Sequence, residues 1–319
     1  MMKKIVQKQP LIISIILSII IFAIGSIFIK GFATIFSLRS ILVLSTFLGI
    51  AAVGQTLVIL LGGIDLSIGF LIGFGNVVTA KLYGDGKSPL ITFTIVIGIA
   101  IFIGVFNGFI SAKFKIHPLI ITLGVGFAIQ GAILLWTKGY PTGSAPTFIT
   151  KFVSIGATVG SFPFPGIVLF WAIITIGIEL FLRYSIFGRQ LYALGSNSLA
   201  AELALVKRVN ISMITYATSS VFAALDGILL LGFTGSAMAT VGEDYLMLTI
   251  GAVVVGGTVM VGGKGNYINT FIGSFILIEL TTVLRGFGLP DQLIPAALGL
   301  IIILLVSIYG RELSIKEKM

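Results

Sequence analysis

The stretch LLGGIDLSIG, residues 60–69, lies between two long apolar runs and contains one ionisable side chain, Asp65. Its glycines at positions 62, 63 and 69 let the backbone turn sharply, or let another helix pack closely against it. The apolar side chains on both sides offer a carboxylate no hydrogen-bond donor. The rest of the chain must therefore explain why an aspartate is tolerated here.

The composition predicts an integral membrane protein. Of 319 residues, 57% are hydrophobic and 10% are charged, and the mean hydropathy is +1.17. This leaves too little polar surface to enclose a soluble core. The net charge of +9 does not indicate nucleic acid as a partner, because the basic residues are scattered between apolar runs and form no patch with interleaved aromatics. The expected partner of the surface is the lipid bilayer.

Several kinds of chemistry are excluded or unsupported by the residue types present. The chain contains no cysteine, which excludes disulfides, thiolate catalysis and thiolate metal sites. No nucleophile with a partner base, histidine pair or metal-ligand cluster stands out. We therefore expect neither an enzyme nor a protein with a cofactor or a metal.

The apolar runs predict an all-α fold, a polytopic bundle of about ten transmembrane helices in a single domain over residues 1–319. Each run is close to the length needed to cross a hydrocarbon layer of about 30 Å. The first follows a basic N-terminus, but no small-residue cleavage pattern follows it, so we interpret it as a retained span. The third is short and glycine-rich, which also fits a segment that enters and leaves on one side. The expected spans are 11–29, 41–61, 68–82, 90–110, 119–136, 166–182, 211–232, 246–261, 268–284 and 293–309.

The distribution of charge predicts the orientation. Most of the 20 lysines and arginines fall in alternate loops that include both termini, so we expect both termini on the cytoplasmic side of a cell membrane. Ten spans divide into two halves of five, an odd number, and an internal duplication would therefore be inverted in the membrane. The likeness of residues 60–69 to VVGGTVMVGG, residues 254–263, hints at such a 5+5 repeat, although glycine-rich stretches often match by chance.

Two long loops differ in character. The loop over about 138–165, expected outside, has four prolines, many small residues and aromatics, which suit an ordered external cap. The cytoplasmic loop over about 183–210 contains Ser196, Asn197 and Ser198, which are suitable N-caps, followed by the strong helix formers LAAELAL. We expect a short exposed helix there. It either only connects two spans or serves as a docking element for a cytoplasmic partner.

Four motifs resemble the permease subunit of bacterial ABC importers for simple sugars, of the ribose, xylose and galactose type. They are GGIDLSIG (62–69), FNGFISAKFKIHPLIITLG (106–124), FGRQLYALGSN (187–197) and VVVGGTVMVGGKG (253–265). Their order and spacing also match, so the resemblance covers most of the chain.

The resemblance implies a division of labour. Two permease copies, identical or related, form the pathway, a separate cytoplasmic ATPase drives it, and an extracytoplasmic binding protein delivers the sugar. The nearest approach to a phosphate loop, GGTVMVGGKG (256–265), fails the required spacing and places Gly265 where Ser or Thr coordinates magnesium. By resemblance, the region that couples to the ATPase comprises Gly188, Arg189, Tyr192, Ala193, Gly195, Asn197, Ala200, Ala201 and Glu202.

Asp65 has two open interpretations at the expected junction of the second span with the cytoplasm. It caps the next helix, a task shared with Ser67, or it belongs to a cytoplasmic gate and pairs with a basic residue in one state only. The cost of an aspartate, about 2.5–3.5 kcal/mol at the centre of a span, shrinks near the interface.

Other polar residues within spans are candidates for the pathway. Amide side chains both donate and accept hydrogen bonds, as a neutral polyol requires, but they also join helices to one another. Asp226 lies well inside a span and is either structural or near the substrate. Glu279 is similarly placed, and it either reaches Arg285 or snorkels toward the interface. The amides are Gln55, Asn76, Asn107 and Gln130.

The chain departs from the family pattern at three places: YLMLTIGA (245–252) lacks two acids, Asp226 replaces a small neutral residue, and residues 204–206 differ from the usual Ser-Gly-Ile. These changes leave the substrate more open than the mechanism. A proton-driven secondary transporter that uses Asp226 or Glu279, and an ABC permease for another solute such as branched-chain amino acids, remain alternatives.

Overall fold

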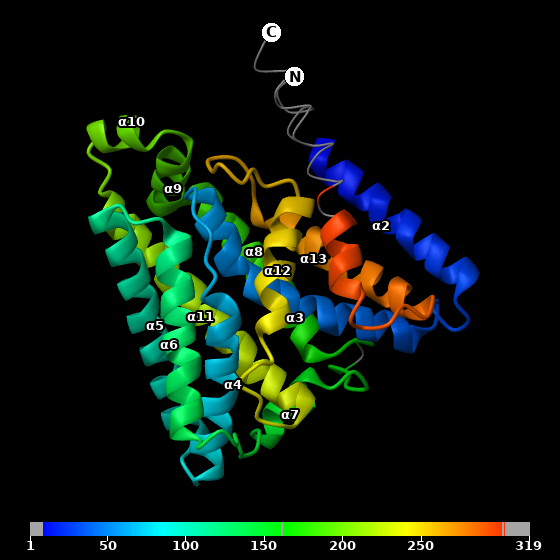
Figure 1. Cartoon of the computed structure of the whole chain (residues 1–319). Coiled ribbons are helices and arrows are strands. Elements are labelled where there is room, and N and C mark those ends of the chain that lie inside the picture. Colours follow the sequence, from blue (N-terminus) through cyan, green and yellow to red (C-terminus); the bar gives the residue numbers. More distant parts are fainter. Residues whose placement is uncertain (1–8, 161, 302, 304–319) are drawn as a thin grey trace.

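The computed structural model describes residues 9–160, 162–301 and 303, and within them the regular secondary structure is helical apart from one isolated bridge between Val159 and Phe162. Figure 1 shows the helices packed into one body. In chain order they are α2 (Gln9–Phe28), α3 (Ile35–Leu60), α4 (Ile68–Gly84), α5 (Pro89–Phe114), α6 (Pro118–Trp136), α7 (Thr147–Val153), α8 (Gly166–Tyr184), α9 (Ile186–Ser196), α10 (Ser198–Leu203), α11 (Arg208–Thr234), α12 (Glu243–Val255), α13 (Tyr267–Gly286) and a last helix over 294–301.

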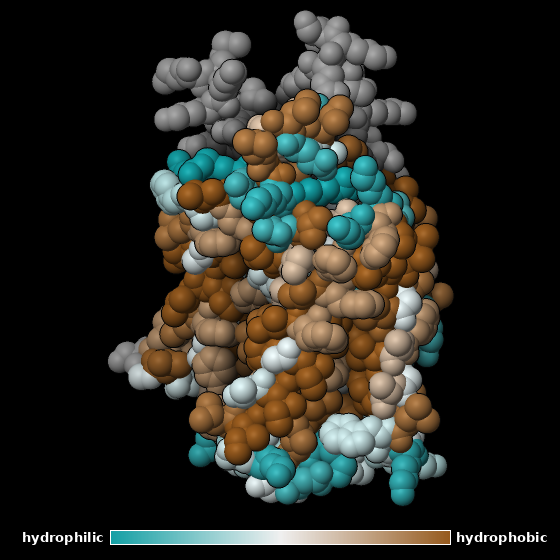
Figure 2. Space-filling view, turned by 90° about the vertical axis from the view of Figure 1, so that its left-hand side faces the viewer, coloured by the Kyte–Doolittle hydropathy of each residue, from teal (hydrophilic) through white to brown (hydrophobic). Residues whose placement is uncertain are grey.

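The surface is that of a membrane protein. Figure 2 shows a hydrophobic belt between two hydrophilic ends. In the described part of the chain, six helices are long and apolar enough to cross a bilayer, namely α3, α5, α6, α8, α11 and α13. The apolar stretches of α2 and α4 are shorter. The all-α membrane fold is therefore confirmed. A helix also lies at the first nine expected span positions, and the described residues 294–301 of the tenth are helical, while residues 302 and 304–309 of that span lie outside the described part of the chain.

The centre of the fold is α3. It is buried along most of its length from Ile41 to Leu60, as expected for a helix that is apolar on every side. Helix α11 packs against it and against α4 and α5, while α12 and α13 pack against the other side of α3 and α2 lies outermost on α13 (Figure 1). The two central helices run in opposite directions: α3 ends, and α11 begins, at the end of the molecule that carries α9 and α10. We call this the α9–α10 end.

Helical structure is interrupted between α3 and α4, where the chain turns back into the protein; we call this interruption the first break. After Leu60 the non-helical residues 61–67 run inward, so that α4 begins near the middle of the molecule (Figure 1). Asp65 bonds Ser219, which lies about 16 Å along α11 from Arg208. The expectation that Asp65 lies at the membrane boundary is therefore wrong. The glycine-rich turn carries the aspartate inward, where it is 1% exposed.

A second break, again a non-helical segment that runs inward, begins at the opposite end of the molecule. The backbone over 235–242, between α11 and α12, lies along α4: the Met238 amide donates to Asn76 Oδ1 at 2.9 Å, and Gly242 packs against Gly69. Helix α12 therefore also begins partway between the two ends of the molecule and ends at Val255, so the span expected over 246–261 is too long at its C-terminal end. Gly257 turns the chain there with a positive φ of 87°.

The loop over 138–165, described except for residue 161, covers the end of the molecule opposite α9 and α10, and we call it the outer loop after its predicted position. Within residues 138–165 the short helix α7 buries Ile149 and Val153 in the apolar core formed with residues of α3, α4 and α11. Gly143 packs on the backbone of Ala80 near the end of α4.

Close packing of α4 on α11 depends on glycine. A methyl group added at Gly227 of α11 would meet the carbonyl oxygen of Ile72, and one added at Gly75 of α4 would meet the carbonyl oxygen of Ala224. The two backbones thus touch directly, the arrangement that small residues permit between membrane helices.

We expect Gly227→Ala to lower the free energy of unfolding by about 1–3 kcal/mol, because the added methyl group forces the two backbones apart. Gly177→Ala on α8 is the matched control, since its methyl group meets no atom within 4 Å, and better helix propensity stabilises it by up to about 1 kcal/mol. Melting temperatures in the same detergent compare them. Equal temperatures for the two variants would contradict the packing account.

Candidate functional site

Two short helices, α9 and α10, form the α9–α10 end. The Ser185 hydroxyl accepts a hydrogen bond from the Gly188 amide at 2.9 Å, and the Asn197 side chain accepts one from the Ala200 amide at 3.0 Å. These N-caps satisfy amides that have no partner within the helix. The predicted short helix after Asn197 is confirmed, and it is preceded by a longer helix, α9.

Helix α9 is fixed to the end of α3 and to the loop between α12 and α13 through backbone contacts. The Leu60 carbonyl oxygen accepts from the Gly263 amide at 2.9 Å, and Gly195 of α9 packs on the same oxygen, where any side chain would collide. The Tyr192 hydroxyl donates to the Gly265 carbonyl oxygen at 2.8 Å. Gly262 packs on the backbone of Gly62. Three of the sequence motifs, GGIDLSIG, FGRQLYALGSN and VVVGGTVMVGGKG, therefore meet at one place.

Burial, with a smaller contribution from the nearby Glu179 carboxylate, raises the pKa of Tyr192 to about 12. The phenol consequently remains protonated, and a hydrogen-bond donor, at any physiological pH.

Glu179 adds a second connection. Its Oε2 accepts from the amides of Tyr267 at 3.2 Å and Ile268 at 3.4 Å, at the beginning of α13. A carboxylate is favourable there because the first amides of a helix are unpaired and carry partial positive charge. The sequence analysis missed this residue. The available signal was a glutamate near the end of the apolar run 166–182.

The residues expected to couple to an ATPase divide into two sets. Gly188 and Ala201 are buried and Tyr192 and Gly195 are partly buried, so these four attach the two helices to the rest of the chain. Exposed at the surface are Arg189, Ala193, Asn197, Ala200 and Glu202.

The two charged residues of the exposed set have partners within the chain. Arg189 Nη1 donates to the Tyr184 carbonyl oxygen at 3.1 Å, and Glu202 pairs with Arg208 at 3.6 Å. Because both members of the ion pair are more than a third exposed, water screens it strongly.

Three exposed leucines lie on α10 and directly after it. Leu203 is 78% exposed and Leu205 is 88% exposed, and Leu199 is also exposed. Figure 2 shows hydrophobic surface beyond the hydrophilic band at this end of the molecule. These leucines lie beyond the hydrophobic belt, next to helix α9, which is held to the rest of the chain. They form a surface suited to a protein partner.

Asp65 is the centre of a buried polar network. Its Oδ1 accepts from the amide of Ser67 at 2.9 Å and from the hydroxyl of Ser67 at 2.5 Å, and its Oδ2 accepts from Ser219 of α11 at 2.7 Å. The Asn107 amide nitrogen donates to the Ser67 hydroxyl at 3.2 Å, and Thr122 accepts from the Leu66 amide at 3.0 Å. Asp65 and Asn107 are therefore brought together, and the partners of Asp65 here are hydroxyls and an amide.

The other polar candidates lie elsewhere. Asn76 holds the second break through Met238, and Gln130 of α6 donates to Glu243 at 3.1 Å. Gln55 and Asp226 are fully buried, and none of their side-chain oxygens and nitrogens has a hydrogen-bond partner in the described structure.

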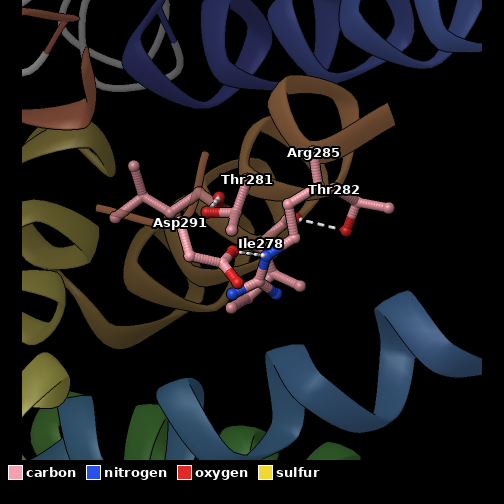
Figure 3. Close-up of polar contacts among 6 residues, drawn as sticks. Ile278, Thr281, Thr282, Arg285 and Asp291 are labelled. Atoms are coloured by element: carbon pink, nitrogen blue, oxygen red, sulfur yellow. Dashed lines mark hydrogen bonds and ion pairs between the residues drawn. The ribbon is translucent and has the colours of Figure 1, made fainter. Parts of the chain in front are cut away.

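Glu279 and Arg285 do not meet. Glu279 accepts a hydrogen bond from the hydroxyl of Ser18 on α2 at 2.9 Å. Arg285, one and a half turns further along α13, points instead toward Asp291, with Nε to Oδ1 at 2.9 Å (Figure 3). The first alternative for Glu279, a contact with Arg285, is therefore wrong, because the turn after α13 places the carboxylate of Asp291 beside the guanidinium.

Known proteins share this sequence pattern along nearly the whole chain. Residues 37–308 match the family described as "Branched-chain amino acid transport system / permease component". The ribose import permease protein RbsC of Escherichia coli K12 is 33% identical over 298 residues, 92% of each chain. The xylose/arabinose import permease protein XylH of Sulfolobus acidocaldarius is 32% identical over 85% of this chain and 77% of its own length. The autoinducer 2 import system permease protein LsrD of Klebsiella pneumoniae is 32% identical over 85% and 82%. Among solved structures, none matches this chain.

We expect Ser219→Ala to lower the free energy of unfolding by about 1.5–3 kcal/mol, because it removes a buried hydrogen bond to a carboxylate. Thr218→Ala is the control, since that neighbouring hydroxyl bonds only the Ile214 carbonyl oxygen of its own helix. Thermal unfolding in lipid–detergent micelles measures both variants. The network has no stabilising role if Ser219→Ala melts at the temperature of the control.

Proposed function

Because the chain belongs to the family of branched-chain amino acid transport system permease components, we propose that it is the transmembrane permease subunit of an ATP-binding-cassette importer for a simple sugar. The observation that supports the sugar most directly is the likeness over 92% of both chains to a ribose import permease. The xylose/arabinose permease, a relative of similar identity, has the same class of substrate in its name. Branched-chain amino acids, named in the family description, are the second candidate.

The proposed energy source is a separate cytoplasmic ATPase. It docks on the exposed leucines and alanines of α10, beside Arg189 and Glu202. Support comes from the contacts that hold α9 at Leu60, Gly263 and Gly265. Because of them α9 and α10 move together with the spans they contact, and we call these two helices the lever. An extracytoplasmic binding protein delivers the sugar at the opposite end, and a second permease copy, identical or related, completes the pathway.

The contacts of α9 suggest how a movement spreads. A displacement of α10 acts on α9, and from there on the end of α3 and, through Gly265 and Glu179, on the beginning of α13. Helices α3 and α13 pack on each other. ATPase closure thus rocks a connected set of spans and exchanges inward and outward openings.

We also propose ten spans in two inverted halves of five, with both termini in the cytoplasm of a bacterial cell. The helices at the first nine expected positions and over 294–301 support this arrangement, as do the opposite directions of α3 and α11, the second helices of the two halves. Each is followed by a break and a short helix, α4 or α12. In the first half α5 packs on α11, and in the second half its counterpart α13 packs on α3.

Broken helices in corresponding positions of two halves are a sequence and structural pointer to a substrate path. The path is therefore proposed near the two breaks, with Asp65 and Asn107 at one and Asn76 and Gln130 at the other. Gln55 and Asp226 have free donors or acceptors within the bundle, which suits a ligand rich in hydroxyl groups. Asp65 serves there as a hinge or gate residue.

We expect Leu203→Asp to abolish binding of the ATPase, because it places a charge in the apolar docking surface of α10. Tyr140→Asp, a substitution at an 82% exposed aromatic in the loop at the opposite end, is the control and leaves binding intact. Co-purification of the ATPase with each folded variant, together with ATP-dependent uptake, gives the readout. Scrambling residues 196–205 extends the test. Normal ATPase binding and uptake after that change would exclude this docking site.

A further inference from the structure

The beginning of α12 carries two acidic residues, Glu243 and Asp244, in an unusual place. We propose that the surface around them, where α12 begins beside α6, faces a water-filled passage at membrane depth and not lipid. The passage would admit water and a hydrated polar solute such as a sugar. The substrate class rests on the proposed function, whereas the contact with water does not.

The depth of this surface follows from its contacts with α4. Gly84, at the end of α4, lies against Gly143 of the outer loop, and Gly69, at its beginning, lies against Gly242. The axial distance between Gly69 and Gly84 is about 22 Å. With Gly84 at one boundary of a hydrocarbon core about 30 Å thick, the residues next to Gly242 lie inside the core, about 8 Å from its other boundary.

The two carboxylates are exposed at this depth. Both side chains lie on the surface of the chain, and Glu243 Oε1 accepts a hydrogen bond from Gln130, which is inside the α6 span. Ionisable side chains within membrane spans face the bundle interior or a water-filled cavity, because lipid does not solvate them.

The backbone leads independently to the same conclusion. Residues 238–242 form no helix, and Met238 and Thr240 are exposed. Irregular backbone at membrane depth exists only where protein buries it or water reaches it, since lipid supplies no hydrogen bonds. The exposed part of this segment therefore does not face lipid, and the two exposed carboxylates next to it favour water over a protein contact.

Other faces of the chain have the properties expected next to lipid. Ile19 of α2, Phe102 of α5 and Ile176 of α8 are exposed and surrounded along their helices by apolar residues. Figure 2 shows such a hydrophobic belt. The surface at the start of α12 is therefore distinct from the lipid-facing belt.

The absence of cysteine permits a direct test with single introduced thiols. Asp244→Cys and Met247→Cys, one turn apart on α12, are each made in the complete transporter in membrane fragments that expose both faces. A charged, membrane-impermeant thiol reagent is added and the labelled fraction is followed with time. Ile176→Cys on α8, at an exposed apolar position about 15 Å from the start of its helix, is the matched control.

We expect both thiols on α12 to react roughly tenfold or more faster than the control, because the reagent attacks the thiolate, which forms in water. Met247 is 66% exposed, so Met247→Cys decides the outcome if Asp244→Cys does not fold. Labelling as slow as that of Ile176→Cys would overturn the proposal and would mean that lipid or a second copy covers this face. Labelling without any dependence of uptake on an ATPase would leave this inference intact and refute the proposed function.

Discussion

The absence of hydrogen-bond partners in lipid is the constraint on which this structure depends. Two segments, 61–67 and 235–242, interrupt the helices inside the membrane, and their amides need partners that lipid does not provide. The protein supplies them from side chains: Asp65 accepts from Ser67, Thr122 from Leu66 and Asn76 from Met238. These three polar residues, scattered through the apolar sequence, thus share one role, which is to accept hydrogen bonds from backbone amides at the breaks.

Helix α3 connects the interior of the protein with the exposed helices α9 and α10. Helix α3 is buried along most of its length, ends at the Leu60 carbonyl on which Gly195 and Gly263 converge, and then leads into the first break. In the proposed mechanism, a movement of α9 therefore acts directly on the backbone that leads to Asp65. Glu179 and Tyr192 make the corresponding connection to α13. Direct backbone contact transmits such a movement better than long flexible side chains, since it leaves little freedom to absorb a displacement.

The sequence was sufficient for the membrane class, for a helix at the first nine expected positions and at the described start of the tenth, and for the N-cap at Asn197, because hydrophobic runs and capping side chains are local signals. It was insufficient for the depth of Asp65, which depends on the inward turn of residues 61–67. The partner of Arg285 depended in the same way on the turn after α13. Glu179 was missed because its role appears only when α8 and α13 are side by side. Gln55 and Asp226 were recognised as buried polar residues, but spacing along a helix does not show whether a partner faces them.

Uptake of radiolabelled sugar into vesicles tests the central claim, that the chain is a passive conduit driven through α9 and α10. The purified chain is compared, with and without a proton gradient, to the chain assembled with its ATPase and binding protein in the presence of ATP. The account predicts accumulation against a gradient only in the assembled system. Accumulation by the chain alone under a proton gradient would contradict it.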